Sequence, residues 1–272
     1  MTDQIAQRRE QDLAGKLAVV TGSSTGIGRQ IALSLSRSGA EIIAHGRRPS
    51  AALKEVIETV SREGGSIQEI TCDLSEDSAT LMEFVDACWA VRGAVDIWIN
   101  NAGADILTGS LASFSFEDKL DALYRVDVRG TALLARRVGE LMLRAGGGPG
   151  SKSILNMGWD QALQGMEGDS GLLFGVTKGS VMALTKSLAQ TLAPIVRVNC
   201  LAPGWIKTDW GAHAHEAWQM RAQNESLMQR WGTPDDVAAM AVYLCSPKAS
   251  FISGQVICIN GGFQYQTMKG HQ

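Results

Sequence analysis

Three glycines with hydroxyl side chains between them follow a short apolar run near the start of the chain. The segment reads Leu17-Ala18-Val19-Val20-Thr21-Gly22-Ser23-Ser24-Thr25-Gly26-Ile27-Gly28. Glycine lets the backbone adopt positive φ angles and approach a ligand without interference from a Cβ atom. Between a strand and a helix, such a turn points backbone N–H groups and the positive end of the helix dipole at an anion. The segment therefore predicts a site for a nucleotide pyrophosphate, and an ordinary glycine turn is the alternative.

Two arginines at the end of the next apolar run indicate which nucleotide this turn would hold. The run ends His45-Gly46-Arg47-Arg48, and no carboxylate follows before Glu55. In dinucleotide-binding folds an acidic residue here binds the ribose 2′-hydroxyl, whereas an arginine accommodates a 2′-phosphate. Guanidinium groups make bidentate hydrogen bonds to phosphate. We therefore predict NADP(H) in preference to NAD(H), with Arg47 as the main ligand and Arg48 or His45 assisting. The alternative is two solvated loop charges.

Alternating strand and helix patterns must position these residues. Strands are predicted over 17–20, 40–45, 66–72, 94–100, 153–157, 196–201 and 256–259. Helices are predicted over 50–63, 77–92, much of 114–144, and 172–192, in addition to the helix that follows the glycine turn. This order predicts an α/β fold, a doubly wound parallel seven-stranded sheet of Rossmann type with helices on both faces. Ligands of such sheets bind at the carboxyl ends of the strands.

The chain is predicted to form one domain over residues 15–263, with tails at 1–14 and 264–272. Residues 204–232 carry tryptophans, histidines and methionines, and we expect this segment to cover the substrate. Such side chains suit an apolar or aromatic ligand. The alternative is a surface helix whose apolar side packs against the body of the protein. Asp105 and Leu107 are further candidates for the pocket wall.

Composition excludes several other classes of protein. The 272 residues carry a net charge of −3, so no basic surface for nucleic acid is expected. The five cysteines are scattered, which predicts reduced thiols and no metal site. No apolar run approaches the ~20 residues of a membrane span, and the polar start lacks the apolar core of a signal peptide. A cytoplasmic protein acting on a small molecule is expected.

Further motifs, in order along 17–262, make the chain resemble the short-chain dehydrogenase/reductase family. They are Thr21-Gly22-x-x-x-Gly26-Ile27-Gly28, Cys72-Asp73-Leu74, Asn100-Asn101-Ala102-Gly103, Pro203-Gly204 with Thr208, Ser253-Gly254-Gln255 and Asn260-Gly261-Gly262. The predicted cofactor ligands are Gly22, Ser24, Thr25, Gly26, Ile27, Gly28, Arg47, Arg48, Asp73, Leu74, Asn101, Ala102, Gly103, Lys178, Pro203, Gly204, Ile206 and Thr208. The resemblance also implies a homodimer or homotetramer, assembled through the long fourth helix and the 172–192 helix.

The resemblance implies a catalytic tyrosine, a lysine four residues later, an upstream serine and an asparagine in the fourth helix. Lys178 fits the lysine, but Phe174 stands at the tyrosine position and Trp159 at the serine position. Asp127 takes the place of the asparagine. No tyrosine lies between Tyr124 and Tyr243, so a shift in register cannot restore the missing phenol.

These replacements predict a changed route for the proton. Phe174 has no ionisable oxygen, and loss of a positioned acid typically costs ~10²–10⁴ in rate. Lys178 is expected to hold the nicotinamide ribose and to pair with Asp127, whose pKa should fall. Asp160, Asp169 or a water held by Lys178 could substitute for the acid. The alternative is that both aspartates are solvated loop residues.

Two functions follow from these observations. The first is an NADP(H)-dependent oxidoreductase acting on a small apolar or aromatic carbonyl or alcohol, or on an activated C=C or C=N bond. The second is a catalytically inactive protein that binds NADP(H) as a structural or sensing subunit. Binding of NADPH followed by turnover on a substrate panel would distinguish them.

Overall fold

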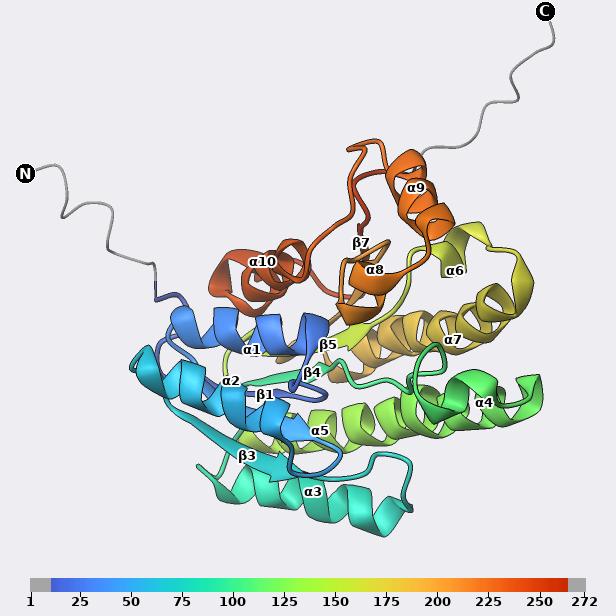
Figure 1. The fold of residues 1–272 in the computed structure, drawn as a ribbon. Coiled ribbons are helices and arrows are strands. Elements are labelled where there is room, and N and C mark those ends of the chain that lie inside the picture. Colours follow the sequence, from blue (N-terminus) through green and yellow to red (C-terminus); the bar gives the residue numbers. More distant parts are fainter. Residues whose placement is uncertain (1–10, 264–272) are drawn as a thin grey trace, which may run out of the picture.

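Seven parallel strands form one sheet in the order β3-β2-β1-β4-β5-β6-β7 (Figure 1). This architecture comes from a computed structural model, which describes residues 11–263. The strands are β1 (Leu17–Val20), β2 (Glu41–Gly46), β3 (Ile67–Thr71), β4 (Ile97–Asn100), β5 (Lys152–Met157), β6 (Val196–Pro203) and β7 (Val256–Ile259). The order of winding reverses between β1 and β4, which opens a crevice at their carboxyl ends. The predicted fold class is confirmed.

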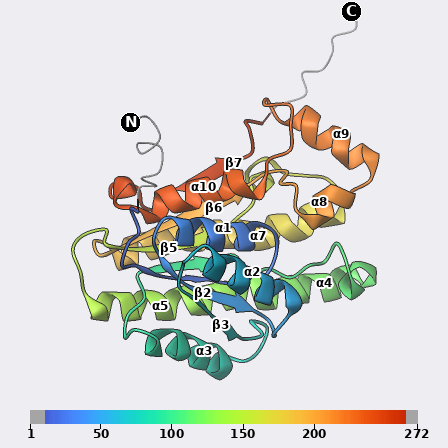
Figure 2. The same cartoon turned by 60° about the vertical axis from the view of Figure 1, so that its left-hand side comes forward.

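Helices cover both faces of the sheet, as Figures 1 and 2 show. The longer ones are α1 (Gly26–Arg37), α2 (Ala51–Arg62), α3 (Ser78–Ala90), α4 (Phe116–Leu123), α5 (Thr131–Ala145), α7 (Gly168–Leu192), α9 (Glu216–Glu225) and α10 (Pro234–Cys245). Short helices are α6 (Gln161–Gln164), α8 (Asp209–His213), and the 3₁₀ turns η1 (Ser110–Ser113) and η3 (Pro247–Ala249). Helices α1, α2 and α10 contribute to one apolar core, and α3, α5 and α7 contribute to the other.

The two cores follow from the alternation of side chains along each strand. In β1, Ala18 and Val20 pack toward α1 and α10, whereas Leu17 and Val19 pack toward α3 and α5. All four are fully buried. A strand covered on both faces has no polar face, which explains why these runs are continuously apolar in sequence.

Two of the differences from the sequence prediction involve Asp127 and Asp96. The helix expected over much of 114–144 is interrupted by η2 (Tyr124–Gly130), a π-helical segment between α4 and α5. π-Helical turns are found frequently at functional sites, and this one contains Asp127. Strand β4 begins at Ile97 and not at residue 94, because the Asp96 carboxylate accepts a hydrogen bond from the backbone N–H of Leu17 at 3.1 Å.

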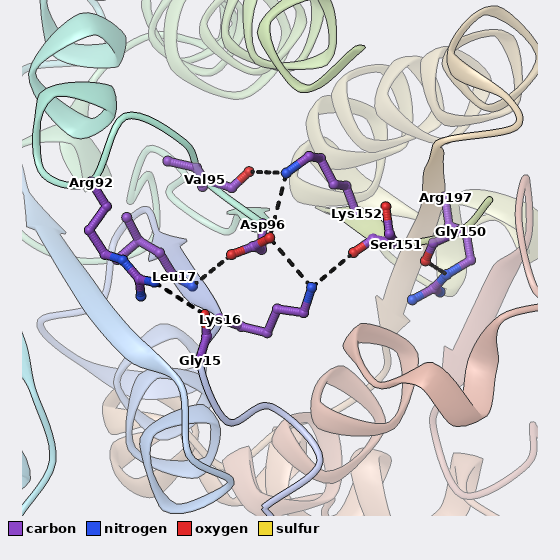
Figure 3. A network of polar contacts seen from close by, with 10 residues as sticks. All are labelled: Gly15, Lys16, Leu17, Arg92, Val95, Asp96, Gly150, Ser151, Lys152 and Arg197. Carbon is purple, nitrogen blue, oxygen red and sulfur yellow. Dashed lines mark hydrogen bonds and ion pairs between the residues drawn. The ribbon is translucent and has the colours of Figure 1, made fainter. Parts of the chain in front are cut away.

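Asp96 also organises the amino ends of the central strands (Figure 3). Its Oδ1 lies 3.4 Å from Lys16 Nζ and 3.5 Å from Lys152 Nζ. Lys16 and Lys152 stand at the starts of β1 and β5, so one carboxylate connects three neighbouring strands. This network lies at the edge of the sheet opposite the crevice.

Within residues 11–263, no helix is long and apolar enough to cross a membrane. The same residues contain no cluster of three or more histidine, cysteine or acidic side chains that could hold a metal ion. The predicted tail 264–272 and the first ten residues of the predicted tail 1–14 lie outside the described part of the chain.

Candidate functional site

The glycine turn after β1 is held against the loop after β4 at very close range. Gly22 has a φ of +65°, and a Cβ atom there would lie 2.8 Å from Ala102 Cα. A Cβ atom on Gly28 would overlap the carbonyl oxygen of Gly22 and the side-chain amide of Asn101. Thr21 Oγ1 accepts hydrogen bonds from the backbone N–H groups of Asn101 and Ala102, each at 3.0 Å. The two loops therefore require glycine at both positions.

Helix α1 begins at this turn and points its amino end into a cleft of about 1520 Å³. The helix N-cap, Thr25, makes no side-chain capping hydrogen bond. Ser24, Thr25 and Gly26 line the cleft. Backbone N–H groups in the first turn of a helix have no partner within the helix, so an anion in the cleft would supply one. The turn has the features of a phosphate cradle.

His45 connects the glycine turn to the second and third strands. Its Nδ1 accepts from the backbone N–H of Gly22 at 3.1 Å, and its Nε2 lies 3.0 Å from the carbonyl oxygen of Cys72. Nε2 must therefore carry the proton, and the ring is neutral. Burial lowers the pKa of His45 to about 4. The prediction that His45 assists a 2′-phosphate is wrong, because both of its ring nitrogens are already engaged in structural hydrogen bonds.

The loop after β2 brings one cation to the cleft. Arg47 is exposed and lines the cleft, whereas Arg48 is exposed and does not. Within residues 11–263, neither arginine takes part in a salt bridge. Asp73, across the same end of the cleft, accepts hydrogen bonds from the Ser75 backbone N–H and hydroxyl through one oxygen. Arg47 is therefore placed to meet a ligand.

Lys178 and Asp127 form a short ion pair behind the cleft wall. Lys178 Nζ lies 2.7 Å from Asp127 Oδ2, and the carboxylate side chain is only 1% exposed. The other carboxylate oxygen accepts a hydrogen bond from the Ala104 backbone N–H at 2.8 Å. The predicted pair is present. It connects α7 and the π-helical segment to the loop after β4.

Phe174 and Trp159 contact each other edge to face. Their ring centroids are 5.9 Å apart, with an angle of 64° between the planes. Phe174 lies four residues before Lys178 on α7, so both side chains lie on one side of that helix. Neither aromatic residue lines the cleft. The two rings stand where the family resemblance places a phenol and a hydroxyl.

Asp160 is buried and not solvated, in contrast to Asp169. Its side chain accepts hydrogen bonds from Asn260 Nδ2 at 2.9 Å and from the Gln161 backbone N–H at 2.8 Å. Desolvation raises the pKa of Asp160 to about 6. Asp169 is exposed in the first turn of α7, where a carboxylate interacts favourably with the helix dipole. Asp160 thus has the raised pKa that proton donation near neutrality requires.

A second cluster fixes α9, within the segment expected to cover the substrate. Arg221 forms two hydrogen bonds with Glu167, at 2.7 and 3.1 Å, and one with Glu225 at 2.6 Å. Its guanidinium lies over the rings of Trp205 and Trp218, at 5.9 and 5.3 Å from their centroids. Helix α9 is thus held to Glu167, the N-cap residue of α7. His213, His215 and Trp218 from this segment line the cleft.

The predicted cofactor ligands and catalytic residues divide into two groups. Those that line the cleft are Gly22, Ser24, Thr25, Gly26, Ile27, Gly28, Arg47, Asp73, Leu74, Asn101, Ala102, Gly103 and Thr208. Those that do not are Arg48, Lys178, Pro203, Gly204, Ile206, Asp127, Phe174, Trp159 and Asp160. Asp105 and Leu107 do line it, as expected. Thirteen of the predicted cofactor ligands therefore share one surface, whereas the other five and the predicted catalytic residues do not line it.

Several contributors to the site were not predicted. The wall opposite the glycine turn extends through Leu111, Phe114 and Arg125, and the Arg221 cluster fixes the covering segment. Amphipathic spacing in 114–125 could have indicated the wall formed by Leu111, Phe114 and Arg125. No local pattern indicates the Arg221 cluster, because Arg221 and Glu167 are brought together only by the tertiary fold.

The chain matches a profile described as Enoyl-(Acyl carrier protein) reductase over residues 22–264. It is 33% identical over 262 residues to Dehydrogenase/reductase SDR family member 4 of Pongo abelii, covering 93% of this chain and 89% of that relative. The chain belongs to the short-chain dehydrogenase/reductase family. It is therefore a member of a family of NAD(P)-dependent oxidoreductases.

Two further members of the short-chain dehydrogenase/reductase family support this assignment. The 3-oxoacyl-(acyl-carrier-protein) reductase FabG of Aquifex aeolicus is 33% identical over 257 residues, or 93% of this chain and 99% of that protein. The solved structure of a 3-oxoacyl (acyl-carrier-protein) reductase from Agrobacterium tumefaciens C58 with NADP bound superposes with a TM-score of 0.81. That structure is 29% identical and covers 96% of this chain and 100% of its own.

Proposed function

We propose that this chain binds NADP(H) and transfers a hydride between its nicotinamide and a small substrate. The observation that carries the proposal is the glycine cradle at the amino end of α1, which shares one cleft with Arg47. The cradle would bind the pyrophosphate. Arg47 would bind the 2′-phosphate that distinguishes NADP(H) from NAD(H). The NADP-bound relative from Agrobacterium tumefaciens is consistent with this choice.

The bound cofactor would supply the hydride, and the chain would supply binding, orientation and control of the proton. Lys178, fixed by Asp127, would orient the nicotinamide ribose as the family resemblance implies. Phe174 and Trp159 pack against each other and offer no acidic proton to a developing alkoxide. Asp160, with its pKa raised to about 6 by desolvation, has an acidity suited to proton donation near neutrality.

The missing phenol favours substrates that need no strong acid beside the reacting atom. A protonated imine already carries its proton. An activated C=C bond accepts hydride at one carbon, and the resulting enolate can take its proton from water. Reduction of a carbonyl, or oxidation of an alcohol, would need the modified arrangement around Lys178 and Asp160. The matching family profile is described as an enoyl reductase, which fits the C=C possibility. Trp218 and Phe114 on the cleft wall favour an apolar or aromatic substrate.

A second candidate function is NADP(H) binding without redox chemistry, as a structural or sensing subunit. The contact between the Trp159 and Phe174 rings favours it, because the family resemblance implies catalytic hydroxyl groups at these two positions and both side chains are aromatic. Cofactor binding by Arg47 and Lys178 would be retained in such a protein.

Compartment and assembly complete the proposal. The five cysteines are free, and four of them are buried, which is consistent with a reducing compartment such as the cytoplasm. A homodimer or homotetramer is proposed from the family resemblance. The expected ligands are small molecules, with no nucleic acid or membrane among the partners.

The test compares Arg47→Ala with Arg48→Ala in NADPH and NADH titrations followed by fluorescence. Arg47→Ala should bind NADPH about 10- to 100-fold more weakly, the range expected for loss of charged hydrogen bonds, while NADH binding changes little. Arg48→Ala is the matched control, since that arginine does not line the cleft. Wild-type protein that binds neither cofactor would refute the proposal.

A second experiment distinguishes the two candidate functions by measuring NADPH oxidation with panels of carbonyl, imine and enone substrates. Turnover on any panel supports the enzyme. NADPH that is bound but not oxidised supports the second candidate.

A further inference from the structure

The ion pair between Asp127 and Lys178 lies immediately behind the wall of the cofactor cleft. Gly103 and Ala104 line the cleft, and both adjoin the Asp127 carboxylate. A Cβ atom on Gly103 would lie 2.9 Å from Asp127 Oδ2. The carboxylate is 1% exposed and the lysine side chain 14% exposed, so water screens this pair only weakly. A buried carboxylate thus stands directly beside the one lysine expected to hold the nicotinamide ribose.

The charge of this pair acts differently on the two forms of the cofactor. The nicotinamide ring of NADP⁺ carries a positive charge, the dihydronicotinamide ring of NADPH is neutral, and the rest of the molecule is the same. An unpaired lysine ammonium near the ring would repel the oxidised form alone. A lysine neutralised by a carboxylate at 2.7 Å would not. The ratio of the two affinities therefore reports the net charge behind the cleft wall.

We propose that Asp127 sets the redox preference of the cofactor site, raising the affinity for NADP⁺ relative to NADPH by neutralising Lys178. This inference rests on the proposed function, because it requires that the chain bind NADP(H). It assigns Asp127 a role distinct from proton transfer. NADP⁺ then competes more effectively with NADPH for the site. In an enzyme, tighter binding of NADP⁺ makes the bound cofactor a stronger hydride donor, and in a binding subunit it gives a response to the ratio of the two forms.

The test measures the dissociation constants of NADP⁺ and NADPH for wild-type protein and for Asp127→Asn. The asparagine keeps one oxygen that can accept from the Ala104 N–H, and its NH2 group replaces the oxygen that faces Lys178, so it removes the charge with little change of shape. The ratio Kd(NADP⁺)/Kd(NADPH) should rise at least about tenfold, the effect expected for one unit charge as far as about 12 Å from the ring at an effective dielectric constant of about 20. Thermal unfolding shows whether the variant remains folded.

Two further variants separate charge from shape. Lys178→Gln leaves the carboxylate unpaired and should lower the ratio Kd(NADP⁺)/Kd(NADPH), because the unpaired negative charge favours the positively charged ring of NADP⁺. The double variant Asp127→Asn/Lys178→Gln restores a neutral pair and should return the ratio to near the wild-type value. Any general loss of ribose contacts weakens both cofactors alike and cancels in the ratio. Lys178→Gln keeps the test decisive if Asp127→Asn does not fold.

Asp96→Asn is the matched control, because it removes a carboxylate paired with lysines at the opposite edge of the sheet (Figure 3). Its ratio should equal that of the wild type. A ratio unchanged in both Asp127→Asn and Lys178→Gln, with both cofactors still bound, would overturn this inference and leave the proposed function standing. Wild-type protein that binds neither form would overturn both.

Discussion

The Trp159–Phe174 contact determines what a single substitution can restore. Phe174→Tyr would add a phenol four residues before Lys178, but Trp159 would still pack against that ring and no serine would orient a carbonyl. We expect Phe174→Tyr alone to leave carbonyl reduction near the wild-type level. Trp159→Ser with Phe174→Tyr should exceed the single variant by about 10²-fold, the lower end of what a positioned acid contributes.

Steady-state NADPH oxidation with a panel of small ketones measures this difference. Trp159→Ser alone is the control, because it opens the space without supplying the acid. Rapid ketone turnover by Phe174→Tyr alone would show that Trp159 does not block the substrate. Equal rates in the double variant and in Trp159→Ser would show that position 174 does not reach the reacting atoms.

At this scale the sequence predicts backbone requirements better than side-chain environments. The need for glycine at positions 22 and 28 was predictable from the spacing of the glycine motif. Only glycine lets the backbone at these positions approach Ala102 and Asn101 so closely. Lys178 and Asp127 were predictable as a pair from the family motifs. The roles of His45 and Asp160 were not, because each depends on burial and on partners from distant segments, Cys72 and Asn260.

His45 ties three strand ends together, and this gives the nucleotide half of the fold a pH-dependent stability. Burial holds its pKa at about 4 against 6.5 for the free group. The unfolded chain therefore binds more protons, and the stability present above pH 6.5 is lost as the pH falls toward 4. Between pH 7 and pH 5, His45 should cost the folded state about 2 kcal/mol.

Between pH 7 and pH 5, Asp160 changes the stability of the folded state in the opposite direction to His45. Its pKa is raised to about 6 from 3.8, so its contribution is full at low pH and is lost as the pH rises through 6. Urea unfolding at pH 7 and pH 5 should show His45→Gln becoming more stable on acidification relative to wild type, and Asp160→Asn becoming less stable. Identical pH slopes in wild type and His45→Gln would exclude the neutral buried imidazole.

Helix α9 is held to the body of the protein by Arg221. The helix contributes little apolar burial of its own, with Ala222 as its buried residue. We therefore expect Arg221→Ala to speed amide hydrogen exchange in 216–225 by about tenfold or more, since a bidentate ion pair and two stacking contacts are lost together. Exchange in α10 should not change.

Arg136→Ala provides the comparison, because Arg136 pairs with Glu140 on the exposed side of α5. Surface pairs of this kind contribute little, so its exchange pattern should match that of the wild type. Unchanged protection of α9 in Arg221→Ala would show that the aromatic side chains alone hold the covering segment.

The π-helical turn is a feature that the spacing of apolar residues along the sequence does not predict. Residues 114–144 have helical spacing, so one long helix is the natural prediction. The turn at η2 inserts extra backbone while the side chains keep a helical appearance, and this brings Asp127 to Lys178. An i+5 hydrogen-bond pattern leaves almost no signal in spacing, so only the three-dimensional structure reveals it.

For the whole molecule, the sheet order was predictable because parallel strands with right-handed crossovers leave few alternatives. An interface between copies of the chain could not be located from the sequence, because the sequence does not show which apolar side chains are exposed. Helix α7 carries Leu172 and Val176, which are 58% and 62% exposed. Tyr124, at the start of the neighbouring η2 segment, is 54% exposed. Apolar side chains gathered on adjacent helices favour an interface between copies.

Association through this helical face can be tested by inserting charge into it. Val176→Glu should convert the expected dimer or tetramer to smaller species in size-exclusion chromatography with light scattering, because a symmetric interface brings the two substituted positions near each other. An unpaired buried carboxylate costs several kcal/mol, enough to lower the affinity between copies by at least about 100-fold. Ala51→Glu, at the exposed start of α2, is the control and should keep the wild-type mass. A monomeric wild type, or a Val176→Glu variant of unchanged mass, would place any interface elsewhere on the molecule.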